Sequence, residues 1–190
     1  GDIHKFCTNL FFVLQTKYRV KHIQKEISDI NFDIPTVICA GVHSKELGKT
    51  VGDNLPIYPI KGYSITIKNP DVAPWTSMLD DEAKIVTSRL GHDRLRVAGT
   101  AELNGYNYDI VEKRIRPLIH WSEKMFPGIN TEHVTPWAGL RPMTPNMMPI
   151  VKQSKNNKNV YYNTGHGHLG WTLSAYTASV ISKQIKEQHD

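Results

Sequence analysis

The sequence predicts an α+β fold with a partial α/β character. Three stretches carry apolar residues at helical spacing, namely residues 2–18, 107–126 and 171–187. Between the first two stretches, alternating apolar residues and glycine-containing turns predict antiparallel strands. Near the C-terminus, a strand-like run leads through a glycine-rich loop into the last helix, and this run supplies the α/β part of the pattern. The 190 residues suit one globular domain or two small lobes.

The N-terminal third is expected to hold one helix and two strands. Asp2 is placed to cap the first helix, which we expect to run to Tyr18. A short buried strand is expected within Pro35–Ala40. A longer strand is expected over Ile57–Ile67, with Pro56 and Pro59 putting its start at an edge of the sheet. Strand alternation places three of its residues on one face: Tyr63, Ile65 and Ile67.

The middle and the end of the chain are expected to alternate strands and helices. Residues 84–90 and 94–102 predict a hairpin around Gly91. The helix over 107–126 contains Pro117, which should kink or split it, and four of its residues should point inward: Val111, Ile115, Leu118 and Met125. Residues 135–144 carry Pro136 and Pro142 and are expected to form a fixed loop. A strand over 160–162 then precedes the last helix.

Composition and charge exclude several kinds of protein. The net charge of +5 is scattered along the chain, so nucleic-acid binding is not expected. The two cysteines, Cys7 and Cys39, form no C-x-x-C pair, which argues against a disulfide framework or a zinc site. No apolar run reaches the roughly 18 residues needed to span a bilayer.

The most informative motif is the glycine loop Gly165-His166-Gly167-His168-Leu169-Gly170, which has the spacing of a dinucleotide-binding fingerprint. That fingerprint also needs a following parallel strand with an acidic residue about 20 residues on, and the sequence has no such strand before Asp190. We therefore expect the phosphates of a cofactor to be held elsewhere. The helix behind the loop could still stabilise an anion or a carbonyl oxygen. The alternative is a strand-to-helix turn without a ligand, and His166 and His168 alone do not predict a metal.

Three further segments are candidates for binding a ligand. Arg141 lies between prolines and near Trp137, and a rigid guanidinium group suits bidentate binding of a carboxylate. The alternative for Arg141 is a structural role, binding loop carbonyls. Tyr63 lies in a strand beside a glycine and could turn its hydroxyl toward a pocket or lie in the core. Ala40-Gly41 ends a buried strand, where ligands bind in α/β sheets.

Taken in order, these motifs resemble one family. Tyr58-Pro59-Ile60-Lys61-Gly62-Tyr63-Ser64, the Gly-Leu-Arg-Pro-Met-Thr-Pro loop around Arg141 and Asn163-Thr164-Gly165-His166-Gly167 are similar to the C-terminal half of the FAD-dependent D-amino acid oxidase superfamily. The likeness is greatest to the bacterial D-amino acid dehydrogenases of the small-subunit type. It implies the remainder of an FAD-binding domain interleaved with an antiparallel-sheet substrate-binding domain. The implied segments are 1–52 and 151–190 for the FAD domain and 53–150 for the substrate domain.

The resemblance also implies site residues. Arg141 would bind the carboxylate of a D-amino acid, and Tyr63 would lie in the strand that faces the active-site cavity. Ala40 and Gly41 would lie near the phosphates and ribose of FAD. The pyrimidine edge of the flavin would face Gly165, His166, Gly167, His168, Leu169, Gly170, Trp171 and Thr172. One departure stands out, because Asn146-Met147-Met148 replaces the family's usual Asp-Gly and is expected to distort a turn.

The chemistry implied is transfer of a hydride from the α-carbon of a D-amino acid to the flavin, followed by hydrolysis to a 2-oxo acid and ammonia. The electron acceptor would be a quinone or a respiratory-chain component, and the location cytoplasmic or peripheral on the inner membrane face. The dinucleotide-binding N-terminal half is expected to be missing, so we expect the chain alone to bind FAD poorly and to be inactive. Two alternatives stay open: an inactive or non-enzymatic remnant of the family, and a related glycine or sarcosine-type amine oxidase.

Overall fold

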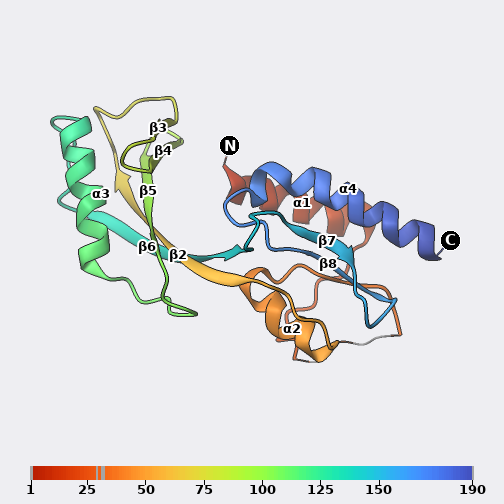
Figure 1. Cartoon of the computed structure of the whole chain (residues 1–190). Coiled ribbons are helices and arrows are strands. Elements are labelled where there is room, and N and C mark those ends of the chain that lie inside the picture. Colours follow the sequence, from red (N-terminus) through yellow and green to blue (C-terminus); the bar gives the residue numbers. More distant parts are fainter. Residues whose placement is uncertain (1, 29, 31–32, 190) are drawn as a thin grey trace. The chain divides into compact units, whose positions relative to one another are not determined.

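The computed structural model describes residues 2–28, 30 and 33–189, which form two compact units (Figure 1). Unit 1 comprises Gly1–Ile57 and Thr144–Asp190, and unit 2 comprises Tyr58–Met143. The chain therefore passes from unit 1 into unit 2 after residue 57 and returns after residue 143, where the sequence suggested boundaries after residues 52 and 150.

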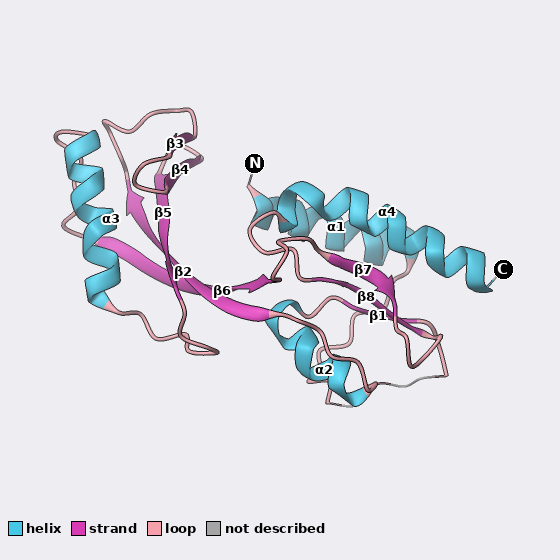
Figure 2. Cartoon of the chain, in the orientation of Figure 1, coloured by secondary structure: helices cyan, strands magenta, loops and turns pink. Residues whose placement is uncertain are grey.

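Unit 1 is a three-stranded sheet with helices on both faces (Figure 2). Its strand order is β1 (Thr36–Ile38), β8 (Val160–Thr164) and β7 (Ile150–Gln153). β1 and β8 run parallel, whereas β7 and β8 run antiparallel. Figure 2 draws α1 (Ile3–Tyr18) and α4 (Gly170–His189) on one side of this sheet and α2 (Ser44–Thr50) on the other. The core of the unit consists of Ile38, Val51, Leu55, Ile57, Val160 and Tyr162.

The two long helices of unit 1 confirm the predicted terminal helices. Asp2 caps α1 by accepting a hydrogen bond from the backbone N–H of Lys5 at 3.2 Å. Phe6 of α1 meets Trp171 of α4 edge to face, with ring centroids 5.1 Å apart. No residue of α1 is buried in the described structure, so its apolar residues remain accessible.

Unit 2 is an antiparallel sheet covered on one face by α3 (Glu112–Met125). The strand order is β3 (Met78–Asp80), β4 (Ile85–Leu90), β5 (Arg94–Glu102), β2 (Tyr58–Lys68) and β6 (Val134–Met143). The predicted hairpin is confirmed as β4 and β5, with Gly91 at φ +73° in the turn. The core between helix and sheet includes Tyr63, Ile65, Ile67, Leu95, Val97, Ile115, Leu118 and Trp121.

The prediction of a loop over residues 135–144 is wrong, because this segment forms strand β6. β6 is the last strand of the sheet and pairs with β2 alone. Proline lacks a backbone N–H but is tolerated on an edge strand where that group would face away from the sheet. Pro136 and Pro142 therefore fit β6. β2 lies inside the sheet, yet its first residues, including Pro59, pair only with β6 because pairing with β5 begins at Lys61.

The helix predicted over 107–126 begins later, at Glu112, and Pro117 does not split it. Residues 107–111 are not helical, and the side chain of Asn107 accepts a hydrogen bond from the backbone N–H of Asp109 at 2.8 Å. Ile115 and Leu118 are buried as predicted, whereas Val111 and Met125 are exposed. Strands β3 and β7 and helix α2 were not predicted, since each is short.

Candidate functional site

In unit 1, the loops that follow the parallel strands β1 and β8 meet at one edge of the sheet. The hydroxyl of Thr164, at the end of β8, donates to the backbone carbonyl of Gly41 at 3.2 Å. The same hydroxyl lies 2.8 Å from that of Ser44, which is buried at the start of α2. Parallel strands present their carboxyl ends at the same edge, where ligands bind in α/β sheets. The structure thus brings Ala40 and Gly41 next to the loop that begins at Gly165.

The backbone of this edge needs its glycines. Gly41, Gly165 and Gly167 have φ values of +56°, +74° and +56°, in the left-handed region that disfavours a side chain. A Cβ atom at Gly41 would stand in open space, with no described atom within 4 Å. α4 begins at Gly170, so its first backbone N–H groups and its positive dipole end lie at the loop. A glycine-lined edge with an open helix N-terminus fits a flat, electron-accepting or anionic group.

The two histidines of the loop differ in their surroundings. His166 is half-buried, and its Nε2 lies 3.0 Å from the hydroxyl of Thr177 on α4. Burial lowers the pKa of His166, which favours the neutral ring. His168, Leu169, Trp171 and Thr172 are exposed at the start of α4. Among the described residues, no group of three His, Cys, Asp or Glu side chains could hold a metal ion.

A hollow of about 710 Å³ opens beside this edge of unit 1. β1 and Ala40 form one wall, and residues of α2 form another. Its remaining lining comes from Glu26, Ile27, Ser28 and Ile30. The hollow therefore reaches the place where the sequence predicts the phosphates and ribose of FAD.

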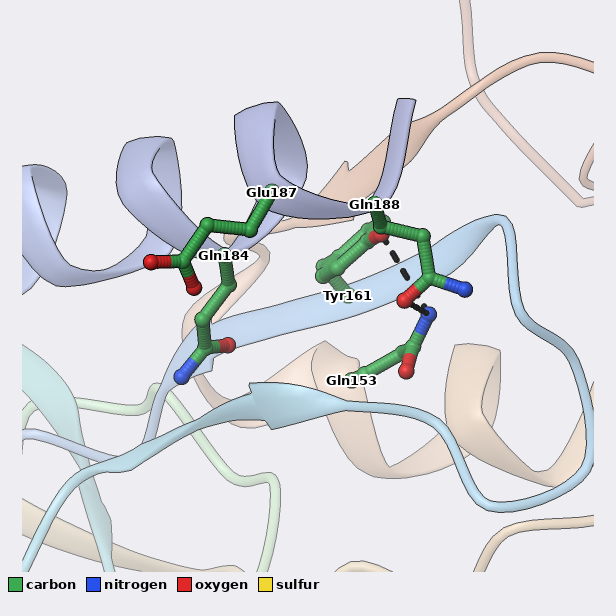
Figure 3. A pocket seen from close by; sticks show the side chains of 5 residues that line it. All are labelled: Gln153, Tyr161, Gln184, Glu187 and Gln188. Carbon is green, nitrogen blue, oxygen red and sulfur yellow. Dashed lines mark hydrogen bonds between the residues drawn. The ribbon is translucent and has the colours of Figure 1, made fainter. Parts of the chain in front are cut away.

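A second hollow in unit 1, of about 540 Å³, contains none of the predicted site residues (Figure 3). It is lined by Gln153, Tyr161, Gln184, Glu187 and Gln188. Gln153 donates to the side-chain oxygen of Gln188 at 2.7 Å and to the hydroxyl of Tyr161 at 3.3 Å. These polar groups join α4 to β7 and β8, and we assign them a structural role.

The turn after β6, which contains Asn146-Met147-Met148, is closed by hydrogen bonds. The backbone N–H of Met147 donates to the carbonyl of Thr144 at 3.1 Å, and that of Met148 donates to the side chain of Asn146 at 3.1 Å. Met147 takes a φ of +59°, which a glycine would adopt without strain. The hydrogen bonds of the turn are therefore formed, and the strain lies in the backbone of Met147.

Replacing Met147 by glycine should stabilise unit 1 by about 1 kcal/mol. The left-handed conformation costs a residue with a side chain about 1–2 kcal/mol, and glycine avoids this cost. Part of the gain is offset because glycine makes the unfolded chain more flexible. Thermal unfolding followed by circular dichroism would measure the change. Met148→Gly is the matched control, since Met148 is also exposed but has no positive φ, and it should destabilise. Equal effects of both substitutions would contradict strain at Met147.

In unit 2, Arg141 covers a glycine on the sheet face opposite α3. A Cβ atom at Gly62 would collide with the guanidinium group of Arg141. Gly62 pairs with Gly139 of β6, and a Cβ atom at Gly139 would collide with the indole of Trp137. Two paired glycines therefore form a floor, on which Arg141 and Trp137 lie. Arg141 makes no hydrogen bond or ion pair within the described part of the chain, so it is not the loop-binding structural arginine of the alternative.

Tyr63 lies on the other face of the same sheet. Successive residues of a strand point to opposite faces, and Tyr63 is 1% exposed within the core beneath α3. Its hydroxyl donates to Glu102 at 2.6 Å. The structure therefore does not bring Tyr63 to the face that carries Arg141.

Glu102 is the centre of a charged cluster behind the glycine floor. It lies 3.2 Å from the ammonium group of Lys61, which is completely buried, and 3.6 Å from Arg114. Lys61 also donates to the side chain of Asn107 at 2.9 Å and to the carbonyl of Asp109 at 3.0 Å. The hydrogen bond from Tyr63 lowers the pKa of Glu102, burial opposes it, and the bond and charge of Lys61 lower it further.

Replacing Glu102 by glutamine should destabilise unit 2 near neutral pH, because Lys61 then keeps its charge without an anionic partner. Because the pKa of Glu102 is lowered in the folded state, its carboxylate stabilises the fold at pH values above the usual pKa of 4.5. This stabilisation is lost as the pH falls through the folded-state pKa. The difference in the free energy of unfolding between wild type and variant should therefore become smaller as the pH is lowered. Urea unfolding between pH 7 and pH 3 would measure it.

Asp81→Asn is the matched control, since it removes a carboxylate that pairs with Lys84 on the surface, with 85% of its side chain exposed. It should change the urea midpoint little at any pH. A gap for Glu102→Gln that stays constant from pH 7 to pH 3 would contradict the proposed ion pair.

The comparison with known families decides which family this architecture represents. The sequence model described as FAD dependent oxidoreductase matches residues 12–184. The chain belongs to this family. FAD is the family's cofactor, and the glycine-lined edge of unit 1 is the part of the described structure that fits it.

Individual relatives agree with this assignment. The chain is 60% identical over 154 residues to D-amino acid dehydrogenase 3 of Mesorhizobium japonicum, covering 78% of the chain and 37% of that protein. It is 37% identical over 185 residues to D-amino acid dehydrogenase 1 of the same organism, covering 96% and 44%. The chain thus spans less than half the length of these relatives. A glycine oxidase structure from Geobacillus kaustophilus shares the fold, with a TM-score of 0.72 at 20% identity over 81% of the chain and 42% of that structure.

Sequence reasoning missed two residues of the unit 2 face and its supporting cluster: Glu102 and Arg96. Ser44 belongs to the Ala-Gly-x-x-Ser run that begins at Ala40. Arg96 alternates with the apolar Leu95 and Val97, which places it on the face away from the core. Only the strand register shows which residues of β2 it meets. None of the described helices is long and apolar enough to cross a lipid bilayer.

Proposed function

We propose that this chain is the C-terminal part of an FAD-dependent D-amino acid dehydrogenase, which oxidatively deaminates D-amino acids to 2-oxo acids and ammonia. The observation that carries the proposal is Arg141, a half-buried guanidinium group laid over Gly62 with no carboxylate partner in the described structure. The names of the curated relatives point to the same activity.

In this proposal each unit contributes a separate function. Arg141 of unit 2 binds and orients the substrate carboxylate through paired N–H donors. Ala40 and Gly41 of unit 1 lie along the phosphates and ribose of FAD. The loop from Gly165 to Gly170 and the start of α4, with Trp171 and Thr172, face the pyrimidine edge of the flavin. When bound, FAD supplies the acceptor for the hydride that leaves the substrate α-carbon.

The α4 N-terminus would stabilise negative charge next to it, because its first N–H groups have no helical acceptor. Tyr63 enters as a positioning residue, since its hydroxyl holds Glu102 behind the glycine floor and not on the face of Arg141. The dinucleotide-binding half would come from a further segment or a separate chain. In this proposal the electrons pass to a quinone or a respiratory-chain component. The protein would be cytoplasmic or peripheral on the inner membrane face.

The visible spectrum of the purified protein tests the proposal. The 190-residue chain is prepared alone and together with a supplied N-terminal dinucleotide-binding half from a relative. A flavin absorption band, bleached by a D-amino acid, is expected only in the paired preparation. Absence of flavin from both preparations would favour the non-enzymatic remnant. Bleaching by glycine or sarcosine but by no other amino acid would favour the amine oxidase alternative.

A further inference from the structure

A second arginine lies beside Arg141 on the same face of the unit 2 sheet. Arg96 of β5 pairs with Thr66 of β2, and its Nε donates to the hydroxyl of Ser64 at 3.2 Å. Gly62 and Ser64 point to the same face of β2, since side chains alternate along a strand. The guanidinium groups of Arg141 and Arg96 therefore lie over neighbouring positions of β2, which are about 7 Å apart along the strand.

Both guanidinium groups lack a counter-charge in the described part of the chain. Within the residues that the structure describes, no carboxylate pairs with Arg96 or Arg141. The carboxylate of Glu102, behind the glycine floor, is engaged by Lys61 and Arg114. Burial lowers the pKa of Arg141, and the positive charge of Arg96 lowers it further. Two like charges that share a half-buried surface repel each other, so an anion placed between them would be stabilised by both.

An aromatic ring completes this face. The guanidinium carbon of Arg96 lies 5.2 Å from the ring centroid of Trp137, whose indole covers Gly139. Trp137 is 53% exposed, so part of the ring stays available to a ligand. This face of the sheet therefore carries two guanidinium groups, those of Arg96 and Arg141, next to the apolar ring of Trp137. A short apolar spacer with a carboxylate at each end matches this arrangement.

We propose that Arg96 is a specificity-determining residue that binds a second carboxylate, so that the substrates are short-chain dicarboxylic amino acids. This inference rests on the proposed function, in which Arg141 binds the α-carboxylate. The remaining N–H donors of Arg96 would bind the side-chain carboxylate, with Ser64 fixing the guanidinium group through its Nε.

Calorimetric titration of the 190-residue chain with succinate and butyrate tests the inference, because the two anions have equally long carbon chains but differ by one carboxylate. Wild type should bind succinate at least tenfold more tightly than butyrate. Arg96→Gln should abolish this preference, and Arg96→Lys should restore part of it through its charge. Arg116→Gln is the matched control, since Arg116 lies on the exposed surface of α3 and pairs with Glu112, and it should change neither affinity.

Two results would overturn the inference alone: equal binding of succinate and butyrate that Arg96→Gln leaves unchanged, or binding of inorganic phosphate as tight as that of succinate. If wild type binds neither succinate nor butyrate, the carboxylate site of the proposed function fails as well. A reconstituted enzyme gives an independent measure, since Arg96→Gln should lower kcat/KM for D-aspartate by at least tenfold more than it lowers kcat/KM for D-alanine.

Discussion

Replacing Arg141 by alanine should weaken the binding of a carboxylate ligand by about 100-fold, because a charged fork that pairs with a carboxylate contributes about 2–5 kcal/mol when both groups are partly withdrawn from water. Arg141 is suited to this role since none of its donors is engaged within the described structure. Butyrate titration of the chain and the KM for a D-amino acid in the reconstituted enzyme would both report the loss. Arg141→Lys should keep a smaller part of the affinity, because lysine retains the positive charge but lacks the paired N–H donors of the guanidinium group.

A second variant reaches the same group indirectly. In Gly62→Ala, the added methyl group would occupy the place of the Arg141 guanidinium, which is the mobile end of a long side chain. Arg141 should move aside at little cost in stability, while carboxylate affinity falls by about tenfold. An unchanged affinity in both Arg141→Ala and Gly62→Ala would reject the role of Arg141.

Replacing Leu118 by alanine should destabilise unit 2 by about 3 kcal/mol. Leu118 is fully buried where α3 packs on the sheet, and its side chain lies close to the backbone of Gly99. Truncation of a buried leucine leaves a cavity, and such changes cost about 2.7–5 kcal/mol. Fluorescence during urea unfolding would measure the loss in unit 2, since Trp121 lies in the same core.

The control for this prediction is Leu103→Ala, which removes the same atoms from a side chain that is 73% exposed. It should change the free energy of unfolding by less than about 0.5 kcal/mol. Similar losses in both variants would contradict a core built between α3 and the sheet.

The sequence predicted the long elements and the order of the motifs correctly because these depend on local periodicity. Helices α1 and α4, the β4–β5 hairpin and strand β2 lie within a few residues of their predicted bounds. β6 was missed since its two prolines are compatible with a strand only at an edge, and edge position is decided by the sheet. The start of α3 was displaced because Asn107 is bound to Lys61, a residue far away in the sequence.

The candidate site shows the same limit more sharply. The glycine loop and Ala40-Gly41 could be identified from their motifs, and the parallel pairing of β1 and β8 brings them together. Tyr63 was expected in the strand that faces the active-site cavity, with its hydroxyl either turned toward a pocket or in the core. Strand alternation and the packing of α3 place its side chain in the core, on the face opposite Arg141. Arg96 has no motif of its own. Its importance depends on the register that sets Thr66 of β2 opposite it.

The paired ends of unit 2 have a consequence for the order of folding. Tyr58 and Met143 are register partners, so a folded unit 2 holds its two ends side by side. About 120 positions separate β1 from β8 in the sequence, and unit 2 accounts for about 85 of them. If unit 2 folds first, the loop that must close between β1 and β8 is effectively shortened to about 40 residues. The entropic free-energy cost of closing this loop then falls by about 1 kcal/mol. We therefore expect unit 2 to fold first and the parallel pair of unit 1 to form last. Swapping unit 2 for a short turn between residues 57 and 144 should then speed the formation of the unit 1 sheet.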